Sequence, residues 1–69
     1  MNDNIPLADD LLRGADDIAA FLGLAPRAVY HAASRNQIPH YRVGAIIFAR
    51  RSTLLAWISE QEKKGRAAA

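Results

Sequence analysis

The sequence contains no cysteine, no long apolar run and, across its centre, no acidic residue. Without cysteine the chain can form neither a disulfide framework nor a thiolate metal site, which suits a reducing cytoplasm. Its longest apolar run, residues 43–49, is too short to span a bilayer, and its acidic N-terminus is unlike a signal peptide. A chain of 69 residues has room for one small core. We therefore expect a single cytoplasmic domain that does not interact with a membrane.

Acidic and basic residues are separated along the chain. Residues 1–17 hold five aspartates and one arginine, whereas residues 18–59 hold no carboxylate at all. The basic residues of this second stretch are Arg27, Arg35, Arg42, Arg50 and Arg51. These arginines could simply keep an apolar domain soluble, but solubility does not require every acid to be excluded. A stretch with positive charge only is typical of a protein that binds a polyanion.

The centre of the chain has the pattern of two short helices joined by a tight turn. Apolar residues recur at helical spacing from Ile18 onward, and Gly23 interrupts them where a turn can use a positive φ. Pro26 suits the first turn of a second helix, because the N–H that proline lacks would have no partner there. We predict the two helices over residues 15–22 and 26–36.

The second predicted helix has a narrow apolar face of small residues and a polar, basic face. Small residues would let it cross the first helix closely, as in a helix-turn-helix. The polar face carries Arg27, Tyr30, His31, Ser34 and Arg35. The arginines and His31 could also be ordinary surface residues, and Tyr30 could lie at the edge of the core.

Two further elements are expected after these helices. Strand-forming residues flank Gly44, so residues 39–49 indicate a β-hairpin, which must pack on the helices to be stable. Residues 52–62 return to helical spacing, with a buried face made of Leu54, Leu55, Trp57 and Ile58.

The predicted fold is mainly α with a small β-hairpin. Its order of helix, turn, helix, two-stranded wing and C-terminal helix is that of a winged helix-turn-helix. We assign residues 14–62 to this domain. Residues 1–13 are expected to form an acidic mobile arm, and residues 63–69 a frayed tail.

Several short motifs also share their order and spacing with a known family. They are an acid before Ile18-Ala19, then Leu22-Gly23, Val29-Tyr30, Ile38-Pro39, Arg42-Val43-Gly44, and Arg51-Ser52 before Leu54 and Trp57. Together they resemble the excisionase-type, or AlpA-like phage-regulator, branch of the MerR-like winged helix-turn-helix domains. The resemblance covers most of the chain, from about Leu12 to Ile58.

The resemblance implies a domain that binds double-stranded DNA. Helix 26–36 would enter the major groove, and the wing, residues 40–49, would follow the adjacent backbone or minor groove. Carried over by position, the contact residues are Arg27, Ala28, Tyr30, His31 and Ser34, with Arg42 on the wing. Arg35 and Arg50 are further candidate phosphate contacts because of their charge. The family usually has basic residues just after the wing glycine, where this chain has Ala45 and Ile46.

These features favour a sequence-specific, nucleoid-associated DNA-binding protein, either a small transcription regulator or an excisionase-like factor in recombination. A protein-interaction adaptor or antitoxin-like module on the same fold, using an apolar wing, is the alternative. So small a domain would need further copies of itself, an integrase or RNA polymerase as a partner. No nucleophile, base or phosphate loop indicates an enzyme. No cofactor is expected, and His31 and His40 lack the further ligands of a metal site.

The predicted hairpin admits two registers. With a two-residue loop at Gly44-Ala45, Phe48 would lie on the inner face and Ile47 would point outward. With a three-residue loop the faces exchange, so that Ile46 and Phe48 are exposed. Burial of Phe48, worth roughly 1.5–3 kcal/mol, favours the first register. The resemblance favours the second, which we expect, and which makes Ile46 and Phe48 a candidate protein interface.

Overall fold

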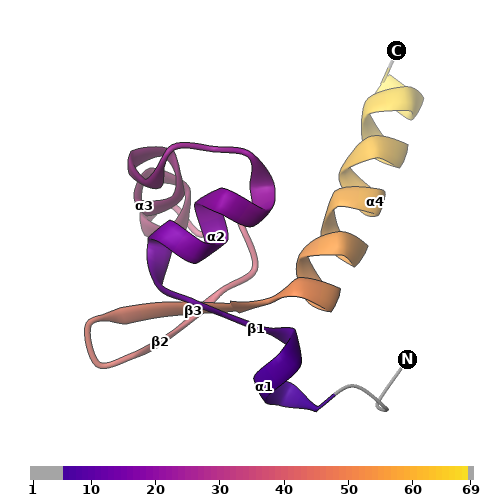
Figure 1. The fold of residues 1–69 in the computed structure, drawn as a ribbon. Coiled ribbons are helices and arrows are strands. Elements are labelled where there is room, and N and C mark those ends of the chain that lie inside the picture. Colours follow the sequence, from indigo (N-terminus) through magenta and orange to yellow (C-terminus); the bar gives the residue numbers. More distant parts are fainter. Residues whose placement is uncertain (1–5, 69) are drawn as a thin grey trace.

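The computed structural model describes residues 6–68, which form four helices and three strands. In chain order these are α1 (Leu7–Asp10), β1 (Leu11–Arg13), α2 (Gly14–Leu22), α3 (Pro26–Ser34), β2 (Tyr41–Val43), β3 (Ile46–Arg50) and α4 (Arg51–Ala68) (Figure 1). Helices α2 and α3 lie on one side of the sheet, while α4 extends away from the other elements (Figure 1). The fold is the expected winged helix-turn-helix, with one more strand than the sequence indicated.

The α2–turn–α3 unit follows the sequence pattern closely. Gly23 takes a left-handed conformation with φ 73°, and the backbone N–H groups of Gly23 and Leu24 donate to the carbonyl of Ala19. Pro26 stands at the start of α3, as expected. This helix ends two residues before the predicted position, because Asn36 adopts φ 55°, a conformation that asparagine tolerates better than most residues.

The sheet is antiparallel, with the strand order β1-β3-β2. The expected mobile arm is therefore wrong for residues 7–13, which form α1 and β1; residues 1–5 lie outside the described part. Leu12 pairs with Ala49 of β3, and both side chains are buried. The apolar segment is only two leucines long, too short to show the alternation that predicts a strand from sequence.

The wing has the two-residue loop, so the expected three-residue loop is wrong. Tyr41 pairs with Phe48 across the strands, and Gly44, with φ 62°, takes the first central position of the tight turn. The buried face is nevertheless the one expected for the longer loop, since Ile47 is 1% exposed and Ile46 is 42% exposed. Register decides which residues face each other across two strands. The helices packed on the sheet decide which face is buried.

Helix α4 continues well beyond the predicted end at residue 62. It is helical through Ala68, so the expected frayed tail is corrected up to that residue; residue 69 lies outside the described part. The alanines near its end are strong helix formers. None of the helices within residues 6–68 combines the length and apolarity needed to cross a bilayer.

The core lies between the sheet and the α2–α3 pair. Its buried side chains are Leu12, Ala15, Ile18, Ala19, Val29, Ala33, Ile38, Ile47, Ala49 and Leu54, and Phe21, Leu22, Ala32 and Trp57 pack against them. Every helix except the short α1 contributes to it, so the relative position of α3 and the wing is held by shared packing.

Candidate nucleic-acid interface

One face of α3 is turned away from the core. Val29 and Ala33 are buried against α2, and the opposite face exposes all five predicted contact residues of this helix, namely Arg27, Ala28, Tyr30, His31 and Ser34. Arg35, directly after the helix, is exposed as well. Tyr30 is 57% exposed, so it does not lie at the edge of the core.

The hydroxyl of Ser34 is limited in the contacts it can make, because it already donates a hydrogen bond within α3. This bond, 2.8 Å long, goes to the carbonyl of His31, one turn earlier. While that bond stands, the Ser34 oxygen can only accept, and a phosphate oxygen needs a donor. Ser34 therefore suits contact with a donor group on a base edge better than contact with the backbone of DNA.

The wing brings Arg42 to the same side of the sheet as α3. Arg42 pairs with Ile47 across the hairpin, and paired residues point to the same face. Ile47 is buried under the helices, whereas Arg42, on the edge strand, is exposed. Arg42 is therefore exposed on the side of the sheet that carries α2 and α3.

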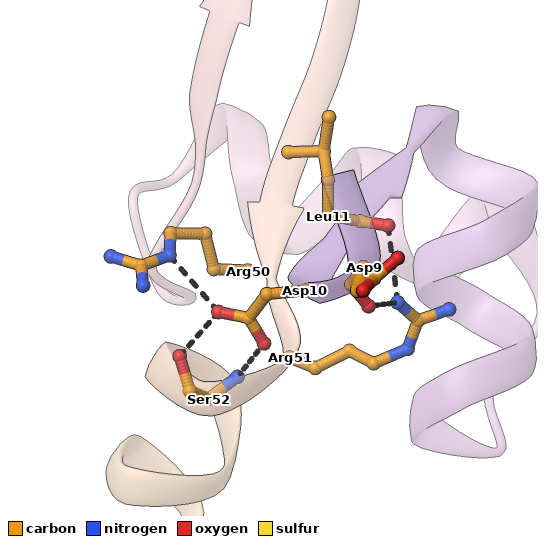
Figure 2. Close-up of polar contacts among 6 residues, drawn as sticks. All are labelled: Asp9, Asp10, Leu11, Arg50, Arg51 and Ser52. Atoms are coloured by element: carbon orange, nitrogen blue, oxygen red, sulfur yellow. Dashed lines mark hydrogen bonds and ion pairs between the residues drawn. The ribbon is translucent and has the colours of Figure 1, made fainter. Parts of the chain in front are cut away.

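Arg50, the remaining predicted contact residue, is half-buried and belongs to a polar cluster below the sheet (Figure 2). Its Nε donates a 3.0 Å hydrogen bond to Oδ2 of Asp10, a side chain that is only 4% exposed. Ser52 donates two more bonds to the same carboxylate, one from its hydroxyl (2.5 Å) and one from its backbone N–H (2.9 Å). We call Asp10, Arg50 and Ser52 the Asp10 cluster.

The Asp10 cluster caps the N-terminus of α4 with a carboxylate from a distant part of the chain. The Ser52 hydroxyl bond lowers the pKa of the Asp10 carboxyl most; burial raises it, and the Ser52 N–H and Arg50 lower it further, for a net decrease. Arg51 strengthens the same junction by donating from Nη1 to the carbonyls of Asp9 (2.7 Å) and Leu11 (3.3 Å). Asp10 therefore stays ionised and holds β1, β3 and α4 together.

A comparison with known families decides what this arrangement is. The model of a family described as "helix-turn-helix domain" matches residues 14–62. The chain belongs to this helix-turn-helix family. No curated protein and no solved structure matches it. The membership indicates binding to double-stranded DNA.

The helix-turn-helix domain has a second exposed surface, on the far side of the sheet from α2 and α3. We call Tyr41, Val43, Ile46 and Phe48 the outer sheet face. The first three are 42–59% exposed, and the ring of Tyr41 stacks on that of Phe48 with centroids 5.5 Å apart. The two predicted interface residues, Ile46 and Phe48, therefore lie on this apolar face.

The two histidines of the helix-turn-helix domain stand on different segments, His31 in α3 and His40 just before β2. His31 is exposed on α3, and Nδ1 of His40 is 2.9 Å from the carbonyl of Ile38. Among residues 6–68, no three His, Cys, Asp or Glu side chains gather closely enough to hold a metal ion.

Asp10 and Ser52 were missed by the sequence-based prediction of the site. Their partners lie 40 and 42 residues apart in the chain, so no local pattern joins them. A weak signal was present, since Ser52 opens a predicted helix whose first N–H groups need an acceptor. That signal does not indicate which aspartate supplies the acceptor.

Proposed function

We propose that this helix-turn-helix domain binds double-stranded DNA sequence-specifically, as a small transcription regulator or an excisionase-like architectural factor. Helix α3 enters the major groove with Arg27 and Tyr30 among its contacts, and the wing follows the adjacent backbone or minor groove through Arg42. The observation that supports this most directly is the exposed face of α3, where every predicted contact residue of the helix is accessible.

Charge supports the same assignment. Before α3 in the sequence, the last acids are Asp16 and Asp17 in the first turn of α2, and no acid lies between residues 18 and 59. Asp10 is buried and already bonded. A DNA backbone would therefore meet arginine side chains along α3 and the wing without an opposing carboxylate in those elements.

The experiment that tests sequence-specific binding is selection of bound sites from a pool of random duplex DNA. We expect a short enriched motif, because one α3 in one major groove reads only a few base pairs. Repeats at a fixed spacing would indicate several copies on one DNA. A pool with no enriched motif, at a salt concentration where binding is retained, would contradict sequence-specific readout.

Binding to DNA is expected to weaken steeply with salt. Three to five phosphate contacts would release counterions and give a slope of log affinity against log salt of about −3 to −4.5. Fluorescence anisotropy with a labelled duplex measures this slope directly, over about 50–300 mM salt. Unchanged affinity across the series would show that phosphates carry little of the binding.

The outer sheet face favours a second function, contact with another protein during DNA binding. Three of its four side chains are exposed, and Phe48 is half-buried. Exposed apolar patches on small proteins often mark interaction surfaces. The partner proposed here is a further copy of this chain on a tandem site, with an integrase or RNA polymerase as the other possible partners.

Replacing Phe48 with serine tests this second function. We expect Phe48→Ser to leave the fold and single-site affinity nearly unchanged, because Phe48 lies outside the core, and to lower cooperativity on tandem sites. Leu55→Ser is the matched control. Leu55 was wrongly predicted to lie on the buried face of α4; it is 57% exposed and lies outside the outer sheet face. Circular dichroism and binding to one-site and two-site duplexes separate the effects. Equal cooperativity in both variants and the wild type would reject the interface.

A further inference from the structure

A hollow lies at the base of the wing, where β2 ends. Strand β2 pairs with β3 only as far as Tyr41 and Phe48, so the described residues that follow Phe48 in β3 have no strand partner on that side. The chain that leads from α3 into the wing diverges there and leaves an open hollow. It is lined by Pro39, His40, Tyr41, Ala49, Arg50 and Thr53, and we call it the wing-base hollow.

Arg50 contributes the positive charge of this hollow. Its Nε is bound to Asp10, and Figure 2 shows its two terminal nitrogens directed away from that carboxylate. A guanidinium held at Nε keeps both terminal nitrogens as donors in a fixed plane, the geometry that matches two oxygens of a phosphate. The side chain is 36% exposed, so these donors are within reach of a ligand.

Other groups around the wing-base hollow also suit an anion. Thr53 and Tyr41 line it and carry hydroxyl groups that can donate. It lies beside the first turn of α4, whose helix dipole adds partial positive charge. The Asp10 charge is buried and already accepts bonds from Arg50 and Ser52, so it faces the cluster rather than solvent.

We propose that Asp10 is a positioning residue, which presents Arg50 to a phosphate of the DNA backbone in the wing-base hollow. This inference rests on the proposed function. It also requires the DNA backbone to pass the open edge of the sheet beside β2, because Arg50 follows Phe48 by two residues in β3 and therefore points away from α2 and α3. Asp10 lies before residues 14–62, the part matched by the family model. The positioning carboxylate therefore comes from a segment that the family match does not include.

The test compares two variants that each remove one negative charge but are expected to change DNA affinity in opposite directions. Removing an acid should strengthen DNA binding if only net charge matters, and Asp9→Asn, at an exposed neighbouring position, measures that effect. Asp10→Asn removes the same charge but places an amide N–H₂ opposite the Arg50 Nε donor, which releases Arg50. We expect several-fold weaker binding to random duplex DNA and a salt slope shallower by about 0.9, the loss of one phosphate contact.

Two further variants separate positioning from stability. Ser52→Ala removes one donor to Asp10 but keeps the bond to Arg50, so it should lower the melting temperature and leave the salt slope unchanged. Arg50→Lys keeps the charge but replaces the planar pair of terminal donors with a single ammonium nitrogen, so we expect weaker binding with a smaller change in the salt slope. This variant also decides the question if Asp10→Asn fails to fold.

The outcomes are distinct. Asp10→Asn binding as tightly as Asp9→Asn, or Arg50→Lys binding as the wild type does, would overturn the inference. A titration with inorganic phosphate, followed by NMR shifts of Thr53, separates the sources of the ligand: a site for free phosphate, with DNA binding independent of Arg50, would also overturn it. Absence of duplex binding by the wild type would instead reject the proposed function itself.

Discussion

Arg27→Ala is expected to lower affinity for the preferred DNA site by about 1–3 kcal/mol, roughly 5- to 150-fold, if Arg27 reads a guanine in the major groove. Arg27 stands in the first turn of α3, is exposed, and lies on the face opposite the buried Val29. An arginine at that place can reach a base edge with both terminal nitrogens. The measurement is the affinity for the selected site and for random duplex DNA, at one salt concentration.

Arg42→Ala is the matched control for this prediction. It removes the same charge from the exposed edge strand of the wing, where a backbone contact is expected. Backbone contacts carry no sequence information directly, so Arg42→Ala should weaken both DNAs by a similar factor. Equal losses on the selected and random DNA for Arg27→Ala as well would show that Arg27 does not read sequence.

Ile47→Ala is expected to lower the free energy of unfolding by about 2–5 kcal/mol, because it leaves a cavity in the core. Ile47 is 1% exposed and lies under α2 at the centre of the sheet. In a domain this small, such a loss is a large part of the total stability. Chemical denaturation followed by circular dichroism measures it.

Ile46→Ala is the control, since it removes the same atoms from the neighbouring residue on the opposite face. Ile46 is 42% exposed, so the change should cost much less than at Ile47. Similar losses for the two variants would mean that the two faces of the wing are not divided as described. A larger loss for Ile46→Ala would instead mean that Ile46 and Phe48 lie on the buried face of the hairpin.

The helix-turn-helix unit could be predicted from sequence because its signals are local. Gly23 and Pro26 fix the turn and the start of α3 through backbone conformation alone, and the small residues of α3 predict its close contact with α2. The exposed face of α3 follows from the same helical spacing. The exposed contact residues on that helix needed no information from distant parts of the chain.

The structures of the wing and of the N-terminal segment were predicted less well, because they depend on contacts between residues far apart in the chain. The loop length at Gly44 was predicted wrongly because it was inferred from which face of the hairpin is buried. Packing against α2, and not the turn, decides that face. Strand β1 has only three residues and is defined by its pairing with β3, far along the chain. Asp10 looked like one of several acids in a polar arm, and its burial depends on Ser52 and Arg50.

Strand β1 has a practical consequence for anyone who trims this protein. A fragment reduced to the family-matched residues 14–62 would lose the strand that covers one side of β3. The backbone donors and acceptors of β3 would then be open along that side, next to Ala49, which would lose its partner Leu12, and such an edge recruits strands from other molecules. Aggregation of that fragment would reflect where the chain was cut, and would say nothing about how the intact domain associates.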